Sequence, residues 1–266
     1  MRRGAAPAIA MMVNTDHVPS PCVQAGGVVS PNCHCACSVV DVGLNDGKTL
    51  LSWVYNASAP PSRMAAIREC VASGSACYYG FEANPIHSSG LSRLQRHLRR
   101  ERHRVALFTE TAFSTAEGNA TFYSDDHIRH DNGERGVGST LIAGMDAIVP
   151  VNGHWYRAGK AGRAFKAVTV RTVHGARFLR SVLATSDRVA LKLDIEGLEF
   201  DWLRDTLVSE PRVLCGLDVL AIEYHAYAMA AASADRASTI PVREARVAFE
   251  WLLTRPPCNL TLVYWD

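Results

Sequence analysis

The chain has 266 residues, of which 48% are apolar and 20% are charged, and this balance is that of a globular protein with its own core. The formal net charge of +2, from 28 basic and 26 acidic side chains, gives no electrostatic reason to expect a nucleic-acid partner. No run of apolar residues is long enough to span a bilayer, so we expect no transmembrane segment.

The first 37 residues are rich in Pro, Gly, Ala and Cys and show no periodicity. We interpret residues 1–37 as a leader that is disordered or loosely packed. The basic start Met1-Arg2-Arg3, followed by a short apolar stretch, leaves a signal peptide as the alternative. Because Pro7 interrupts that stretch, we favour a leader and a cytoplasmic protein, with the secretory pathway as the other option.

The cysteines and glycosylation triplets do not settle the compartment. The chain has 8 cysteines, but a chain of this length needs no disulfide framework to fold. The N-x-S/T triplets at Asn56, Asn119 and Asn259 matter only if the protein is secreted. The run Cys33-His34-Cys35-Ala36-Cys37 is spaced more tightly than zinc ligands and has no second ligand pair, so we predict no metal site there.

From Ser38 onward, short apolar runs alternate with longer amphipathic stretches, which predicts one α/β domain over residues 38–266 with a mainly parallel, doubly wound sheet flanked by helices. The predicted strands are Ser38–Val42, Ala76–Phe81, Arg104–Phe108, Val189–Asp194, Val219–Glu223 and Leu260–Tyr264. The predicted helices are Lys48–Tyr55, Arg63–Ser73, Ile86–Arg100, Leu198–Leu207 and Val242–Thr254. Between about 120 and 171 the pattern loosens. Thr121–Ser124 and Ala167–Arg171 alternate like strands, with a Gly- and Asp-rich stretch between them, and we interpret this part as an insertion beside the active site that could form a lid.

The first predicted strand ends in the loop Asp41-Val42-Gly43-Leu44-Asn45-Asp46-Gly47 and runs into a helix. The two glycines let a ligand approach the backbone, and Asn45 tolerates a left-handed conformation. An open α/β sheet binds nucleotide-like ligands at this position, although an ordinary tight turn has the same pattern. Since G-x-G-x-x-G is absent, a ligand with adenosine but no phosphate fits better than a dinucleotide.

Acidic residues end three later strands. Glu82 follows the second strand, where a carboxylate can accept hydrogen bonds from both ribose hydroxyls. Asp194 ends the strand after the insertion, and Glu223 ends the next strand, two residues before His225. Between them, Glu196 and Glu199 serve equally well as catalytic groups or as acids that complement the dipole of the following helix.

Taken in order, these motifs resemble those of the FkbM family of methyltransferases. That family has a D-x-G-x-N-x-G loop, an F-E-x-x-P strand end, a D-x-E-G-x-E strand end and a later E-x-H, and all four occur here. The segments Glu110–Ser114 and Gly138–Leu141 are also similar to parts of the family, so the resemblance covers roughly residues 38–264.

The resemblance implies a Rossmann-like class I methyltransferase fold, S-adenosylmethionine as the methyl donor, and transfer to oxygen, often a hydroxyl of a sugar or other small metabolite. Its final antiparallel strand is expected to be short or missing here. Carried over by motif, Glu82 would hold the ribose, and Glu110 and Thr111 would lie near the adenine. The methionine and sulfonium end would be lined by Asp41, Gly43, Asn45 and Gly47.

Methyl transfer from a sulfonium is an in-line displacement with a neutral leaving group, so the enzyme mainly positions donor and acceptor. A hydroxyl acceptor gains from a general base. We predict that His225 or Asp194 is this base, with Glu223 orienting its neighbour. The converging acids could instead hold a divalent cation, but no ligand spacing singles out a metal.

Two rival functions follow from the same motifs. One is a catalytically inactive binding protein that keeps the nucleotide crevice. The other is a nucleotide-dependent oxidoreductase, which the missing phosphate-binding glycines oppose.

Overall fold

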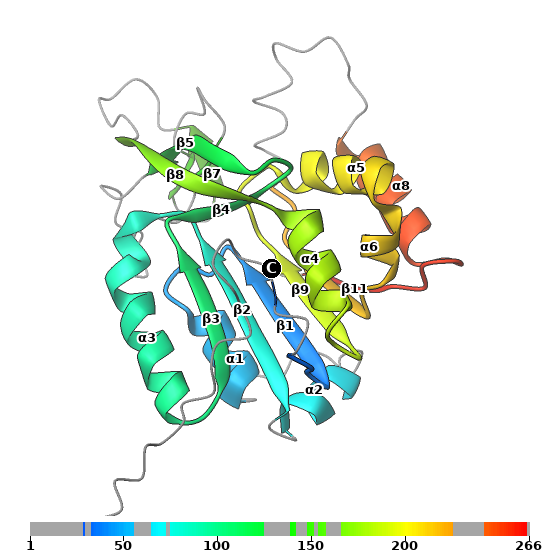
Figure 1. Cartoon of the computed structure of the whole chain (residues 1–266). Coiled ribbons are helices and arrows are strands. Elements are labelled where there is room, and N and C mark those ends of the chain that lie inside the picture. Colours follow the sequence, from blue (N-terminus) through cyan, green and yellow to red (C-terminus); the bar gives the residue numbers. More distant parts are fainter. Residues whose placement is uncertain are drawn as a thin grey trace, which may run out of the picture.

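A computed structural model describes residue 29 and residues 33–55, 65–72, 75–124, 139–141, 148–151, 154–157, 166–225 and 242–264. Its central sheet has six parallel strands in the order β11–β10–β9–β1–β2–β3 (Figure 1). These strands are β1 (Cys37–Val42), β2 (Ala76–Glu82), β3 (Arg104–Thr109), β9 (Val189–Leu193), β10 (Val219–Ile222) and β11 (Thr261–Tyr264). The chain order reverses between β1 and β9, which confirms the predicted doubly wound sheet and creates a topological switch point there.

The central strands are buried on both faces, as the near-continuous apolar runs in the sequence require. Every residue of β1 is buried. Cys37 and Val39 belong to one core cluster, whereas Val40 and Val42 belong to another, because successive side chains of a strand point to opposite faces. The sheet therefore lies between two apolar layers.

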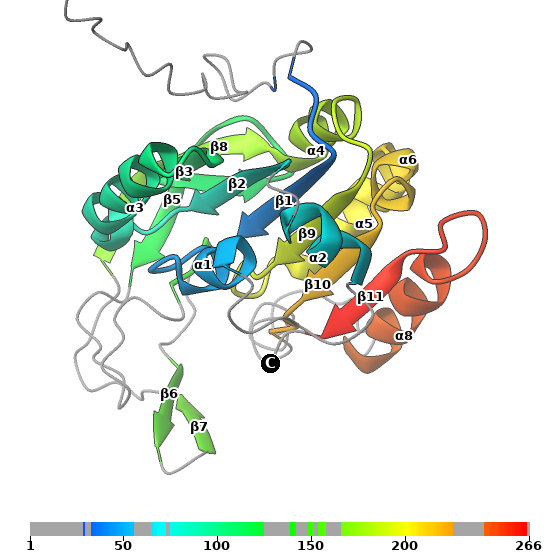
Figure 2. The ribbon, with the colours of Figure 1, turned by 90° about the horizontal axis from the view of Figure 1, so that it is seen from below.

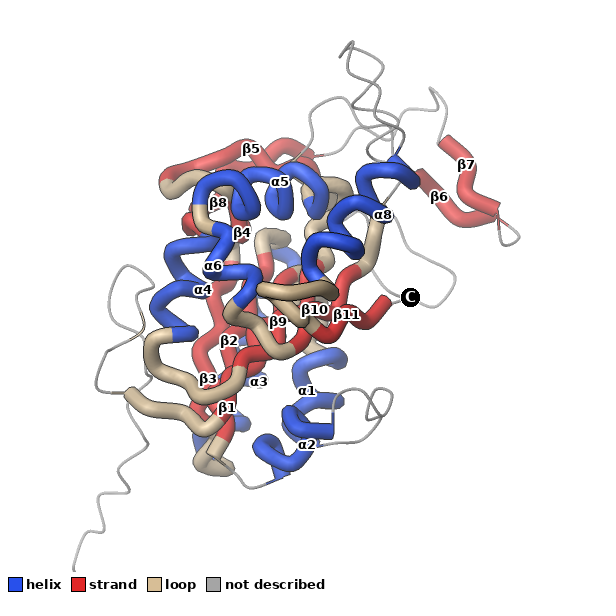
Figure 3. The backbone as a smooth tube through the Cα atoms, turned by 90° about the vertical axis from the view of Figure 1, so that its right-hand side faces the viewer, coloured by secondary structure: helices blue, strands red, loops and turns tan. Residues whose placement is uncertain are grey.

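Helices supply these two layers (Figures 2 and 3). One face is covered by α1 (Lys48–Tyr55), α2 (Ala65–Ala72) and α3 (Ser88–Arg100), and the other by α4 (Gly175–Leu183), α5 (Glu199–Ser209), α6 (Pro211–Cys215) and α8 (Val242–Leu253). The helix predicted from Ile86 begins instead as a 3-10 turn, η2 (Pro85–His87), because the side chain of Asn84 accepts a hydrogen bond from Ile86 N and caps it.

A second, smaller sheet lies across the end of the central sheet where β3 leads into β4 (Figure 1). It consists of β4 (Thr111–Ser114), β8 (Lys166–His174) and β5 (Gly118–Ser124), in that order. The predicted strands Thr121–Ser124 and Ala167–Arg171 lie within β5 and β8 and pair antiparallel. A hairpin of β6 (Ile148–Val151) and β7 (His154–Arg157) belongs to the same stretch of chain. Its function as a lid stays a prediction.

The structure describes only part of the chain at each end of the predicted domain. Residues 1–28 lie outside the described residues, but Cys35 is buried, and its backbone N donates to Thr185 O at 2.9 Å. The packed chain therefore begins before residue 38. At the other end β11 runs parallel to β10, and the described part of the central sheet contains no antiparallel strand. Nor does the described chain contain a helix long and apolar enough to cross a membrane.

Candidate active site

The loop after β1 has the conformation that its small residues predict. Gly43, Asn45 and Gly47 have φ angles of +77°, +51° and +88°. A Cβ on Gly43 would lie 1.8 Å from the backbone oxygen of Asp194, so only glycine fits between the loop and the end of β9. The backbone N of Gly47 donates to Leu44 O at 2.9 Å and closes the turn.

Glu82 ends β2 directly beside this loop. One oxygen of its carboxylate accepts a hydrogen bond from Asn45 N at 2.6 Å, and the other accepts from Asn84 N at 2.7 Å. Burial raises the pKa of Glu82 to about 7, although the hydrogen bonds from Asn84 and Asn45 act in the opposite direction. Because each carboxylate oxygen has a second lone pair, Glu82 retains capacity to accept from a ligand hydroxyl.

Asn84 is a site residue that the sequence analysis missed. It is buried, and its side chain accepts from Ser124 Oγ at 3.2 Å and donates to Ser139 Oγ at 3.1 Å. These contacts fasten the small sheet and the 139–141 segment to the end of β2. Its place between Glu82 and Pro85 in the F-E-x-x-P motif was the only signal in the sequence.

The sequence analysis also missed Lys192. This buried lysine of β9 contacts the end of β9 and the loop after β1, which lie on the two sides of the switch point. Its Nζ donates to Asp194 Oδ2 at 2.8 Å and to Gly43 O at 3.0 Å, and lies 3.6 Å from Asp41 Oδ1. Burial lowers the pKa of Lys192, but the attraction of Asp41 and Asp194 outweighs it and holds the pKa above its usual range. Burial likewise raises the pKa of Asp41 to about 6, against the effect of Lys192.

His225 is buried among carboxylates at the end of β10. Its Nδ1 lies 2.7 Å from Glu199 Oε1, and its Nε2 lies 3.4 Å from Glu196 Oε2, 3.4 Å from Glu223 Oε1 and 3.8 Å from Asp194 Oδ1. Burial lowers the pKa of His225, but hydrogen bonds to Glu199 and Glu223 raise it to about 12 overall. The imidazole therefore carries both protons in this arrangement.

Glu199 does more than complement the dipole of α5. Its side chain is fully buried, and its carboxylate also accepts from Ile195 N at 3.0 Å and Gly197 N at 3.1 Å. Glu199 thus orients both His225 and the turn after β9. Glu223, for which the sequence predicts an orienting role, has a more exposed side chain and lies 3.4 Å from the other ring nitrogen, Nε2, of His225; its role stays a prediction.

Asp194, Glu196 and His225 form a group that could hold a metal ion, since each offers one ligand atom and all three atoms lie within 4.8 Å of one another. Two carboxylates and a neutral imidazole suit several divalent cations, so a metal ion would bind in place of the proton on His225 Nε2. In the described chain a second such group, Cys33, Cys35 and Cys77, is disulfide-bonded and therefore offers no thiolates.

A pocket of about 620 Å³, including the part open to solvent, lies at the carboxyl ends of β1, β2 and β9. Five of the predicted residues line it: Gly43, Asn45, Glu82, Thr111 and Asp194. The apolar part of the lining comes from both sheets and includes Phe81, Ala83, Phe113, Phe122 and Leu141. This pocket occupies the switch point at which open α/β sheets bind their ligands.

The other predicted residues do not line this pocket. Asp41 is buried beneath the loop, and Gly47 packs against the side chains of α3. Glu110 is exposed and accepts a hydrogen bond from Ser88 Oγ at 3.0 Å. His225 and Glu223 lie beyond Asp194, on the β10 side. The roles assigned to all of these residues stay predictions.

Comparison with known proteins gives one result. The family model described as the methyltransferase FkbM domain matches residues 41–237, which is most of the chain and includes every motif from the loop after β1 to His225. No curated protein and no solved structure gives a significant match. The chain belongs to the FkbM methyltransferase family.

Proposed function

We propose that this protein is an S-adenosylmethionine-dependent O-methyltransferase that acts on a hydroxyl of a sugar or another small metabolite. The observation that carries the proposal is the pocket at the switch point, which has Glu82 on its β2 side and Asp194 on its β9 side. The pocket thus offers one carboxylate suited to holding a ribose and a second suited to receiving a proton.

The lining suits the methyl donor. The carboxylate of Glu82 can accept from ribose hydroxyls, and the apolar side chains of Phe113, Phe122 and Leu141 offer contacts for a purine ring. Gly43 and Asn45 leave the backbone accessible next to them. When bound, the donor supplies an electrophilic methyl group on a sulfonium, and the residues of the chain position the acceptor oxygen in line with it.

We assign the general base to Asp194 because it lines the pocket whereas His225 does not. Its Oδ2 accepts a hydrogen bond from Lys192, whereas its Oδ1 lies 3.8 Å from His225 Nε2, beyond hydrogen-bond distance, and can therefore accept from the acceptor hydroxyl. That proton becomes strongly acidic as the oxygen gains its new bond to carbon, so a carboxylate is basic enough to receive it. His225 then positions Asp194 and Glu196 through its Nε2.

Binding and turnover test this assignment separately. Calorimetric titration with S-adenosylhomocysteine should show binding that weakens about 10- to 100-fold in Glu82→Gln, because hydrogen bonds to a charged group are lost. Asp194→Asn should retain that affinity but lose at least about 100-fold in kcat in a methyl-transfer assay over a panel of sugar and small-molecule hydroxyl acceptors. The matched control is Asp201→Asn, an exposed acid on α5.

The outcomes distinguish the candidate functions. Absence of binding by the folded wild-type protein would refute the donor site. Binding without transfer to any acceptor would favour the inactive binding protein. A loss of turnover in His225→Asn but not in Asp194→Asn would move the base to His225.

A divalent cation held by Asp194, Glu196 and His225 is the alternative to direct base catalysis, and the convergence of their three ligand atoms favours considering it. Such an ion would orient the acceptor oxygen and make its hydroxyl more acidic. Turnover that is lost on dialysis against EDTA and restored by Mg²⁺ or Mn²⁺ would establish this alternative, and turnover unchanged by EDTA would reject it.

A further inference from the structure

The six cysteines whose side chains the structure describes are all disulfide-bonded. Cys35 pairs with Cys77 and Cys215 with Cys258, and Cys33 and Cys37 are bonded as well. No free cysteine is found in the described part of the chain. A cytosolic protein keeps its thiols reduced, so such complete pairing is the pattern of an oxidising compartment.

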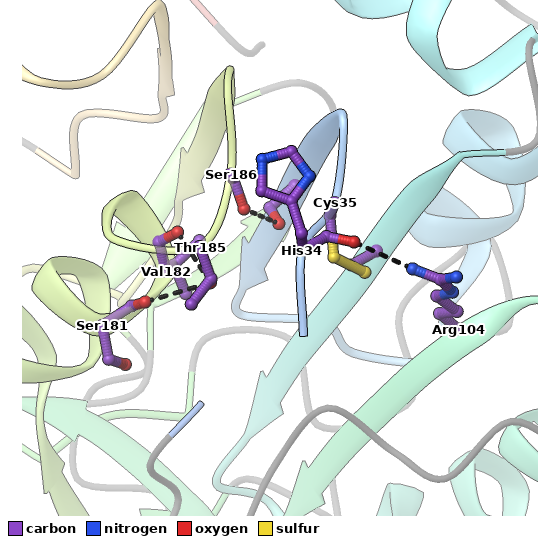
Figure 4. The surroundings of a disulfide bond; sticks show 9 residues. His34, Cys35, Arg104, Ser181, Val182, Thr185 and Ser186 are labelled. Carbon is purple, nitrogen blue, oxygen red and sulfur yellow. Dashed lines mark hydrogen bonds between the residues drawn. A yellow bond between two sulfur atoms is a disulfide. The ribbon is translucent and has the colours of Figure 1, made fainter. Parts of the chain in front are cut away.

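The two bonds fasten different parts of the fold. Cys35–Cys77 joins the segment before β1 to β2, where Arg104 Nη1 also donates to His34 O at 3.0 Å (Figure 4). Cys215–Cys258 joins the end of α6 to the turn before β11. Two extensive apolar clusters already provide the core, so small size does not explain these bonds. Their presence indicates instead that the chain folds in an oxidising compartment.

Two glycosylation triplets lie at the surface of the same structure. Asn119-Ala120-Thr121 is on β5, an edge strand of the small sheet, and Asn259-Leu260-Thr261 directly follows Cys258. Both asparagines are exposed. The third triplet begins at Asn56, outside the described residues.

Both positions leave the pocket open. Asn119 is three residues from Phe122, so the two side chains point to opposite faces of β5, and Phe122 lines the pocket. Asn259 precedes β11 and therefore lies at the amino edge of the central sheet, whereas the pocket lies at the carboxyl edge. A sugar chain on either residue would not obstruct the methyltransferase site.

We propose that this protein matures in an oxidising secretory compartment and carries N-linked glycans on Asn119 and Asn259. In forming each disulfide, two thiols give two electrons and two protons to the disulfide of a thiol–disulfide oxidoreductase. In forming each glycan, the asparagine amide nitrogen bonds to the anomeric carbon of a lipid-linked oligosaccharide, loses one proton and displaces the lipid diphosphate. This proposal does not depend on the acceptor or on the base of the methyl-transfer reaction.

The test expresses the chain in cultured eukaryotic cells in two forms, one routed to the secretory pathway by an added signal peptide and one kept in the cytosol, without an added signal and with the signal-like residues 1–13 removed. The routed form should lose mass on treatment with peptide-N-glycosidase F. Asn119→Gln and Asn259→Gln should each remove one glycan, and the double variant should remove both. Asn56→Gln measures any contribution of the third triplet.

Thiol state and folding complete the test. Alkylation of quenched, denatured samples should leave the routed form unmodified and label the form without a signal, which should also be more sensitive to protease. A routed form without glycans at these residues would overturn the modification sites. A form without a signal that is equally protease-resistant and retains free thiols would overturn the oxidising compartment.

Discussion

At the scale of single residues, the site depends on charges that are buried together. Lys192 is only 2% exposed, yet it lies within hydrogen-bonding or ion-pair distance of Gly43 O, Asp41 and Asp194. Transfer of these charges from water is costly, and their mutual attraction offsets that cost only while every partner is present. Removing one member therefore leaves uncompensated charge in the core.

Lys192→Met should accordingly lower the free energy of unfolding by about 3–5 kcal/mol, because Asp41 and Asp194 lose their cation. In the double variant Asp41→Asn/Lys192→Met the loss should be smaller than the sum of the two single losses. Urea denaturation of the wild type, both single variants and the double variant gives the coupling free energy. Additive losses would show that Asp41 and Lys192 do not interact.

If Glu82 holds the donor ribose as proposed, donor binding should depend on pH. Its pKa of about 7 in the folded protein lies above the ordinary value of 4.5, so the carboxylate is increasingly protonated below pH 7. A protonated carboxyl accepts ribose hydroxyls poorly. We expect the affinity for S-adenosylhomocysteine to be constant above about pH 8 and to fall as the pH decreases through 7.

The raised pKa of Glu82 also makes the stability of the protein decrease as the pH rises. Between pH 4.5 and about 7 the folded state binds more protons at Glu82 than the unfolded state does, so this residue's contribution to stability decreases as pH rises through that interval. Glu82→Gln should bind the ligand weakly at every pH in this window and should be more stable than wild type at pH 8. A wild-type affinity that does not change from pH 6 to 8 would contradict the role of Glu82.

At the scale of elements, Gly43 in the loop after β1 and Gly90 in the helix α3 differ in whether another residue could replace them. Gly43 has a φ of +77° and faces the backbone of Asp194, whereas Gly90 lies within α3 with only the tip of Arg93 within 4.0 Å of a new Cβ. The first position requires glycine, and the second only tolerates it.

Gly43→Ala should therefore destabilise the protein by more than about 1 kcal/mol and weaken ligand binding, because the loop must move away from β9. Gly90→Ala, the matched control, should stabilise the protein by about 0.5–1 kcal/mol through helix propensity. Thermal denaturation with and without S-adenosylhomocysteine measures both effects. Equal effects of the two substitutions would indicate that the close approach at Gly43 is unimportant.

The elements that the sequence predicted are those with a clear hydrophobic periodicity and with turn-forming residues at their ends. The bounds of α1 agree with the prediction, and each central strand agrees within one residue at either end. Other elements have no such signals. The helix α4 follows β8 without a loop, and its N-cap, His174, makes no capping hydrogen bond. The strand β4 is separated from β3 by Glu110 alone, which takes a φ of +52° that sequence patterns assign to glycine or asparagine.

At the scale of the whole molecule, each disulfide should contribute to stability by constraining the unfolded chain, by an amount that grows slowly with the length of the loop it closes. Cys215 and Cys258 are 43 residues apart, so the double variant Cys215→Ser/Cys258→Ser should lose about 2–4 kcal/mol of unfolding free energy. Denaturation without reductant measures this loss, with Ser209→Ala on the exposed end of α5 as the control. Unchanged stability would mean that the bond does not form in solution.

How much of the site could be predicted also depends on scale. Glu82, Asp194 and Thr111 end strands or follow them closely, and parallel strands bring such positions to one edge, so their convergence in the pocket could be anticipated. Asn84, Lys192 and Glu199 act through contacts with other segments of the chain. Their partners Ser139, Gly43 and His225 are distant in sequence, and only the folded structure brings them together.

The double contact of Lys192 has a consequence for the order of events in the site. The same ammonium group contacts the backbone of the loop after β1 and the carboxylate of Asp194. A shift of that loop would therefore reach Asp194 through a single side chain. If the loop binds the methyl donor as proposed, donor binding would align the proposed general base before the acceptor is bound.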